Sequence, residues 1–312
     1  MSWRIIYIEN SHKVSLYLNN LKIEDGDETY VVPIDDINTV ICNNYKMHMT
    51  VQLLCKLSQA NVCVIICEKN GLPEIVLNPL NGNYATFRNQ ELQINLPEER
   101  KIELWKVIIE GKIQNQIAVL EKNKRNNEII EKLYQYQATV KSGDQSNREG
   151  LAAKLYFREL YGHNFIRERE IPDAINIALN YGYALIRAMM SRSVSAKGFI
   201  PAWGICHKNP YNHFNLVDDF IEVYRPIVDD WVFQHMLGHF FTREKRLQLI
   251  EQMGKKIMFG GKRYQIMRSM DIFLDGIVNY MKTGKKSYLK IPEVLIYEDV
   301  ERLQVYENNI IF

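Results

Sequence analysis

GFIPAWGICHKNPYNHFNLVDDFIEVYRP, residues 198–226, joins an irregular loop to a helix. Its first half is rich in Gly, Asn and Pro, which favour loop backbone, and it carries His207. From about Asn215 onward apolar residues predict a helix, with Asp219 and Glu222 three positions apart on one face. A loop-to-helix return of this length can bring the histidine and both carboxylates to one point.

A further carboxylate lies upstream, at the start of a predicted Ala-rich helix. The stretch REGLAAKLYFRELYG, residues 148–162, places Glu149 in the first turn of this helix. One imidazole and two or three carboxylates from separate segments are a ligand set suited to a divalent metal. Such an ion neutralises the charge that develops in a phosphodiester reaction and aligns the reacting oxygens. The pattern therefore favours a metal site for phosphate chemistry.

The carboxylates also have purely structural explanations. The spacing of Ser146 and Glu149 fits a capping box, in which the glutamate would bond the backbone at the helix start. Asp218 and Asp219 would lie in the first turn of a helix that Asn215 could cap, where negative charge is favourable. Helix capping alone would then account for these acids.

Glu222 and His207 have similar alternatives. Glu222 lies among aromatic and aliphatic residues, where an ion pair with Arg225 or with a neighbouring helix would satisfy its charge. His207, next to Lys208, could be an ordinary polar loop residue. The spacing by itself leaves a metal site and a set of structural contacts both open.

The first 95 residues predict a small domain made mostly of strands. Short runs rich in β-branched and aromatic residues are separated by turn-forming stretches such as 24–27. Residues 50–59 instead have apolar positions at helical spacing. We therefore expect residues 1–95 to form a mostly antiparallel β domain with one short helix. The strands are expected at residues 3–8, 14–18, 29–33, 36–42 and 61–67.

The character of the sequence changes after residue 96. Apolar residues between Ile102 and Leu120 recur every three or four positions, which predicts one helix of about 25 residues. Helical patterns continue to about residue 282, so we expect residues 96–290 to form an all-α catalytic domain and residues 291–312 a C-terminal tail. The expected fold class is α+β, with the small β domain preceding the larger helical one.

The composition is that of a globular protein, with 46% hydrophobic and 24% charged residues. The longest clean apolar run, residues 62–67, is too short to cross a bilayer, so we expect no membrane partner. The five cysteines are an odd number and lie partly in apolar runs. They predict reduced thiols and a cytoplasmic location.

The net charge of +2 is unevenly divided along the chain. Residues 1–95 hold seven basic and ten acidic side chains, so the positive excess lies in the remainder. Residues 243–268 hold eight Lys or Arg and two Glu, and residues 282–290 hold four Lys and no acid. These clusters fit either a solvated helix face or a polyanionic partner such as DNA.

Several short sequence blocks follow one another along nearly the whole chain. They are PIDDI at 33–37, RNQ at 88–90, KIQNQ at 112–116, EGLAAKLYF at 149–157, ALNYGYAL at 178–185, GICH at 204–207 and DFIEVYRP at 219–226. In this order they resemble the CRISPR-associated adaptation integrase family, the universal catalytic subunit of spacer acquisition. Together with the FNL run at 214–216, they resemble most the branch that accompanies type II systems.

The resemblance implies an N-terminal β domain and a helical domain that holds a catalytic Mg²⁺ or Mn²⁺. The family's metal ligands are the Glu that opens the EGxAA helix, the His that ends the GxxH loop and an acid of the DxxE block. In this chain these correspond to Glu149, His207 and Glu222. Asp219 would be a further ligand or a residue behind the ligands.

The resemblance also implies an enzyme, a divalent-metal-dependent DNA endonuclease and integrase. Such an enzyme joins the 3′-OH ends of a short duplex with 3′ overhangs to CRISPR repeat DNA by transesterification, and it also hydrolyses phosphodiesters. The implied assembly is a homodimer paired through the β domains, in a larger complex with a small ferredoxin-like adaptation partner. The alternative, if the metal site is absent, is a non-catalytic DNA-binding scaffold subunit.

Basic side chains are expected to contact the DNA backbone, because phosphate contacts give sequence-tolerant, salt-dependent affinity. One set lies near the expected metal and a second set lies further along the chain. The first set is Arg148, Lys154 and Arg158; the second is Arg243, Lys245, Arg246, Lys262, Arg263 and Arg268.

Overall fold

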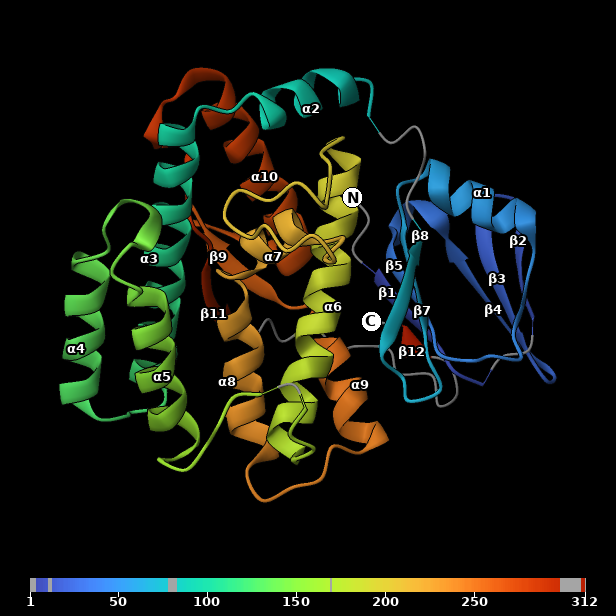
Figure 1. Cartoon of the computed structure of the whole chain (residues 1–312). Coiled ribbons are helices and arrows are strands. Elements are labelled where there is room, and N and C mark those ends of the chain that lie inside the picture. The colour runs from blue at the N-terminus through green and yellow to red at the C-terminus, as the bar shows by residue number, and fades with distance from the viewer. Residues whose placement is uncertain (1–3, 11–12, 78–82, 169, 298–309, 312) are drawn as a thin grey trace.

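The computed structural model describes residues 4–10, 13–77, 83–168, 170–297 and 310–311. Two sheets of the N-terminal part lie beside a group of long helices formed by the rest of the chain (Figure 1). A β region followed by a mostly helical region confirms the expected α+β class. Within the described ranges, no helix combines the length and the apolar character needed to pass through a bilayer.

The first sheet has the strand order β12-β1-β5-β7-β8. Its centre is parallel and consists of β1 (Arg4–Ile8), β5 (Ile37–Cys42) and β7 (Cys63–Cys67). At its edges β8 (Pro73–Leu77) and β12 (Ile310–Ile311) pair antiparallel. The central strands are short apolar runs, as expected for strands covered on both faces. The β region is therefore mixed, with parallel pairing where the sequence analysis expected mostly antiparallel strands.

The second sheet has the order β4-β3-β2-β6. Strands β2 (Lys13–Tyr17), β3 (Asn20–Asp25) and β4 (Glu28–Pro33) form an antiparallel meander, and β6 (His48–Met49) pairs parallel with β2. The short helix η1 (Ile34–Asp36) leads into β5, and the expected helix is α1 (Val51–Gln59).

Alternate residues of β1 face two different cores. Ile6 and Ile8 pack with residues of the second sheet, such as Leu21, in the smaller core. Ile5 and Tyr7 belong to the larger core, which they share with the helices. One face of the first sheet thus packs against the helices and shares their hydrophobic core.

The long helix expected after Pro97 is α3 (Glu98–Lys122), which has 25 residues. In Figure 1 the long helices α4, α5, α3, α8 and α6 run alongside one another. Two short 3₁₀ helices are η2 (Ser142–Asp144) and η3 (Lys286–Tyr288). The other helices are α2 (Thr86–Ile94), α4 (Asn127–Ala138), α5 (Arg148–Tyr161), α6 (Ala174–Ala196), α7 (Asn215–Ile221), α8 (Arg225–Met236), α9 (Arg243–Gln252) and α10 (Ile266–Thr283).

The helical region also contains a small antiparallel sheet, so it is mostly rather than entirely helical. Its order is β10-β9-β11, formed by β9 (Lys256–Phe259), β10 (Lys262–Gln265) and β11 (Glu293–Tyr297). Gly260 and Gly261 both have positive φ, as a two-residue hairpin turn requires. Of the expected tail, β11 joins this sheet and β12 joins β1, while residues 298–309 lie outside the described part of the chain.

Gly182 of α6 lies directly against Val228 of α8. A Cβ atom there would lie 2.3 Å from Cγ1 of Val228 and 3.3 Å from Cδ2 of Leu249. The helices can pack at this distance only because residue 182 has no side chain.

We expect Gly182→Ala to lower the free energy of unfolding. Alanine gains about 1 kcal/mol in helix propensity, but overpacking a core costs about 1–3 kcal/mol and Val228 is too stiff to move aside. Denaturant unfolding measures the net change, and adding Val228→Ala should recover part of the loss. A raised unfolding midpoint for Gly182→Ala would contradict the close contact.

Candidate metal centre

Glu149 lies in the first turn of α5 with its side chain free of any capping role. Asn147 accepts one backbone N–H of the helix at 3.3 Å, and Asp144 accepts its first two at 2.7 and 2.9 Å. Ser146 Oγ has no hydrogen-bond partner among the described residues. The capping box between Ser146 and Glu149 is therefore not formed, because Asn147 and Asp144 already satisfy the helix start.

Lys112 of α3 connects Glu149 to Glu222. Its Nζ lies 2.7 Å from Glu149 Oε1 and 2.5 Å from Glu222 Oε2. Glu222, whose side chain is 4% exposed, directly follows α7 and also contacts Arg225 Nη2 at 3.0 Å. The expected ion pair with Arg225 is thus present, but Glu222 shares a second cation with Glu149.

His207 is held by Asp219 at the irregular loop before α7. Asp219 is fully buried, and its Oδ1 lies 2.7 Å from His207 Nδ1 and 3.1 Å from the backbone N of the same residue. Its Oδ2 accepts the N–H groups of Ile205 and Cys206 at 2.6 and 3.1 Å. A carboxylate offers about four lone-pair sites, so these contacts occupy them all. The expectation that Asp219 could be a further metal ligand does not match this geometry, because it lies behind His207.

The sequence allows Asn215 as the cap of α7. In the structure its side chain instead holds the preceding loop. Its side-chain amide donates to the carbonyls of Ala202 and Asn209, and its Oδ1 accepts from the N–H of Asn209. Gly204 is required for the same turn, because a Cβ there would lie 2.2 Å from the carbonyl oxygen of His207. The GxxH spacing is therefore a steric requirement of the loop.

Asp218 forms an ion pair with a side chain, in addition to any favourable interaction with the start of its helix. Its two carboxylate oxygens accept a forked pair of hydrogen bonds from Arg187 of α6. Asp218 and Asp219, adjacent in sequence, thus point to different surroundings. Only Asp219 contributes to the His207 site.

The charges of these groups shift their protonation equilibria. The hydrogen bond that His207 donates to Asp219 raises the pKa of His207, against the opposing effect of burial, and the charges of Glu222 and Glu149 raise it further. Burial would raise the pKa of Glu222, but Arg225 and Lys112 outweigh it and the pKa is lowered. Burial would likewise lower the pKa of Lys112, but Glu222 and Glu149 raise it. At neutral pH Glu222 is therefore ionised and Lys112 is protonated.

The donor set fits a divalent cation such as Mg²⁺ or Mn²⁺. Nδ1 of His207 is engaged by Asp219, so Nε2 is the ring nitrogen with an available lone pair. Oε2 of Glu222 is buried, and its partner within the described residues is the ammonium group of Lys112 at 2.5 Å. In the part of the chain that is described, no three His, Cys, Asp or Glu side chains are already grouped as metal ligands. Lys112, rather than open space, separates the two glutamates.

The residues expected to contact DNA near the metal lie on α5, the helix that carries Glu149. Lys154 and Arg158 are exposed, and the guanidinium of Arg148 lies over the ring of Tyr136 at 5.1 Å. Their position on this helix follows the expectation from the sequence.

The second set of basic residues is spread over α9, β10 and the first turn of α10. Lys245 is on α9, Lys262 and Arg263 are on β10, and Arg268 is on α10. The remaining two residues of this set, both on α9, contact other side chains of the protein. Arg243 pairs with Glu9 at 2.5 Å, and Arg246 lies over the ring of Tyr181 at 5.9 Å.

Lys112 and Asp144 are site residues that the sequence analysis did not single out. Lys112 occupies a position on the buried face of α3, between Ile109 and Ile113. A lysine within an apolar stripe was a usable signal, because a charged side chain there needs buried partners. Asp144 gave no comparable signal, since loop aspartates are common.

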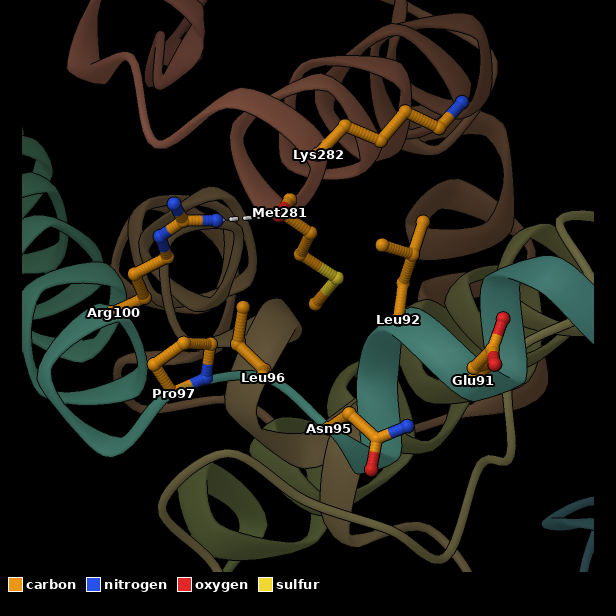
Figure 2. Close-up of a pocket in the computed structure, with 8 residues that line it drawn as sticks. All are labelled: Glu91, Leu92, Asn95, Leu96, Pro97, Arg100, Met281 and Lys282. Atoms are coloured by element: carbon orange, nitrogen blue, oxygen red, sulfur yellow. Dashed lines mark hydrogen bonds between the residues drawn. The ribbon is translucent and has the colours of Figure 1, made fainter.

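A separate pocket of about 320 Å³ lies where α2, α3 and α10 meet (Figure 2). Arg100 in its wall donates to the backbone carbonyl of Met281 at 2.9 Å, which satisfies the end of α10. The pocket includes no residue of the metal centre and is not part of it. Its lining residues are Glu91, Leu92, Asn95, Leu96, Pro97, Arg100, Met281 and Lys282.

Comparison with known proteins places the chain among the CRISPR-associated proteins. Residues 6–258 match the family model described as CRISPR associated protein Cas1. The CRISPR-associated endonuclease Cas1 of Neisseria meningitidis serogroup C (strain 8013) is 32% identical over 299 residues, which cover 95% of this chain and 97% of that protein. The chain therefore belongs to the Cas1 family, and the resemblance found in its sequence blocks is confirmed.

Solved structures share the fold at lower sequence identity. A casposase bound to its integration product matches with a TM-score of 0.72 and 20% identity, over 97% of this chain and 96% of that one. A chain of a Cas6-RT-Cas1–Cas2 complex matches with a TM-score of 0.68 and 17% identity, over 91% of this chain and 36% of that one. The order of a β region and a helical region is thus common to these proteins.

We expect Asp219→Asn to lower the pKa of His207 toward its ordinary value, because it removes the charge and hydrogen bond that raise it. A raised histidine pKa stabilises the fold below the ordinary pKa, and this contribution is lost as the pH rises through the raised value. The variant should therefore lose more stability at pH 5 than at pH 8, on top of about 1–3 kcal/mol for buried N–H groups left without an acceptor.

An NMR titration of the His207 ring measures the pKa, and denaturant unfolding at the two pH values measures the stability. Asp218→Asn is the matched control, since Asp218 pairs with Arg187 instead. An unchanged His207 pKa in Asp219→Asn would show that Asp219 does not govern the ring.

Proposed function

We propose that this Cas1-family protein is a divalent-metal-dependent DNA integrase and endonuclease of CRISPR adaptation. The observation that carries the proposal is the convergence of Glu149 of α5 and Glu222 of the turn after α7 on one ammonium group, at 2.7 and 2.5 Å. The charges of both glutamates also act to raise the pKa of His207, in the same direction as the hydrogen bond to Asp219.

Each residue has a distinct role in this proposal. Glu149, Glu222 and Nε2 of His207 would hold Mg²⁺ or Mn²⁺, while Asp219 orients the imidazole and fixes its proton on Nδ1. When bound, the ion supplies charge neutralisation at the phosphate and alignment of the reacting oxygens. Arg225 keeps Glu222 ionised through its 3.0 Å contact.

The reaction exchanges one phosphodiester bond for another. The 3′ oxygen of the short duplex forms a bond to a phosphorus atom of the repeat, and the bond from that phosphorus to its former 3′ oxygen breaks. The attacking hydroxyl loses one proton and the leaving oxygen gains one, so no external energy source is needed. With water as the attacking group, the same site would hydrolyse DNA. Lys154 and Arg158, both exposed on α5, would hold the phosphate backbone in this proposal.

The names of similar proteins support this assignment. The Neisseria relative is named an endonuclease, and the casposase structure contains an integration product. The structural neighbour in complex with Cas2 supports assembly with a second adaptation protein, which in this proposal is the small ferredoxin-like partner.

A homodimer paired through the N-terminal region is also part of the proposal. Several apolar side chains of that region are exposed, including Leu18 at 77%, Val51 at 74% and Val31 on the outer strand β4. Apolar residues on an outer strand and its neighbours are typical of a protein contact surface.

The test is strand transfer of a fluorescent short duplex with 3′ overhangs into a repeat-containing plasmid, with the small partner present. Product should require Mn²⁺ and disappear in EDTA. We expect His207→Ala to slow transfer at least about a hundredfold, equal to ~2.7 kcal/mol of barrier, without loss of folding or of DNA binding.

His213→Ala, an exposed histidine of the same segment, is the control and should keep full activity. Full activity in both His207→Ala and Glu149→Ala would contradict the proposed site. A wild-type protein that binds the duplex tightly but yields no product from its cognate repeat would favour the scaffold alternative.

A further inference from the structure

Lys112 is a buried cation in the middle of the longest helix. Its side chain is 10% exposed and lies on the same face of α3 as Ile108 and Trp105. Removing an ammonium group from water is costly, and only close partners compensate it. Its partners are Glu149 and Glu222. The charges of these two acids offset the cost of burying the lysine.

The position of Nζ resembles that of a metal ion shared by the two carboxylates. Mg²⁺ and Ca²⁺ lie about 2.0–2.6 Å from carboxylate oxygens, and Nζ lies 2.7 and 2.5 Å from its two oxygens. A divalent cation bound by both glutamates would meet the ammonium at the same place. The two cations repel each other and cannot share that space.

We propose that Lys112 is a built-in counter-cation that holds the metal-free site together and leaves the space between Glu149 and Glu222 when a divalent metal binds. The inference rests on the proposed metal-dependent function and goes further by naming what the metal must displace. Without Lys112, buried Glu222 and partly exposed Glu149 would face each other with less compensation, which would favour separation of α5 from α7. With it, the metal binds only by replacing an existing ion pair, so Lys112 lowers the metal affinity.

Arg225 makes such an exchange possible without loss of the site. It contacts Oε1 of Glu222 at 3.0 Å, whereas Lys112 contacts Oε2 of the same carboxylate. Its guanidinium also lies over the ring of Tyr183 at 4.8 Å, which fixes its position. Glu222 therefore keeps one cationic partner after Lys112 has moved away.

The experiment is calorimetric titration of Mn²⁺ into the full-length protein without DNA at pH 8, where carboxylates stay ionised. Lys112→Met keeps the length of the side chain and removes its charge. Because the metal no longer has to displace an ammonium group, the variant should bind Mn²⁺ about tenfold more tightly or better. A structural role for Lys112 predicts the opposite, since disordered ligands bind a metal more weakly.

Lys122→Met is the matched control. Lys122 lies on the same helix and its Nζ is 2.6 Å from Oδ2 of buried Asp230, so the substitution removes a comparable ion pair away from the proposed ligands. The control should bind Mn²⁺ with wild-type affinity. Unchanged or weaker Mn²⁺ binding by Lys112→Met would overturn the inference.

A second measurement needs no substitution and remains decisive if Lys112→Met does not fold. Acetylation of wild-type lysines by an activated ester, read by mass spectrometry, should modify Lys112 several-fold faster in saturating Mg²⁺ than in EDTA. Lys122 should react equally in both. Equal reactivity of Lys112 in both conditions would show that it is not displaced.

The outcomes separate this inference from the proposed function. A wild-type protein that binds no Mn²⁺ overturns both. Mn²⁺ binding that is lost in His207→Ala but unaffected by Lys112→Met supports the metal site and overturns only the counter-cation.

Discussion

The structure depends on the cost of bringing two acids of like charge together, one of them buried and the other partly exposed. Glu222 is almost completely inaccessible to solvent, and Glu149 shares its partner Lys112. Two carboxylates that share one cationic partner can both stay ionised only when cations lie between or beside them. Lys112 and Arg225 provide that compensation, and the lowered pKa of Glu222 is its consequence. In the proposed function, a divalent metal cation would supply part of this positive charge.

The fold supplies these charges from elements that a rigid core holds in place. Lys112 comes from α3, Glu149 from α5, and Glu222 from the turn between α7 and α8, and all four helices bury side chains in the same hydrophobic core. His207 is the exception, because it lies on a loop. Its position is instead determined by four contacts to buried Asp219 and by the absence of a side chain at Gly204. Hydrogen bonds thus fix the position of the loop, whereas apolar packing fixes the positions of the helices.

Periodicity predicted the long helix α3, the β-rich first part of the chain and the helix after the His207 loop, because each depends on local spacing. It did not predict the parallel pairing of β1, β5 and β7, since pairing direction is set by contacts between distant segments. The hairpin at Gly260 and Gly261 lies within the range where the sequence predicts helical patterns, so periodicity did not predict it either. Lys112 was missed because its function depends on two partners that are remote in sequence, and Asp219 changed from possible ligand to support once its contacts were known.

The central claim is that one divalent metal binds between Glu149, Glu222 and Nε2 of His207. Anomalous diffraction from Mn²⁺-soaked crystals of the wild-type protein and of His207→Ala tests it most directly. The account predicts one anomalous peak within ligand distance of all three side chains in the wild type, about 2.0–2.3 Å for nitrogen and oxygen donors, and a weakened or absent peak in the variant. A peak at another place, or Lys112 still between the two glutamates at saturating Mn²⁺, would contradict it.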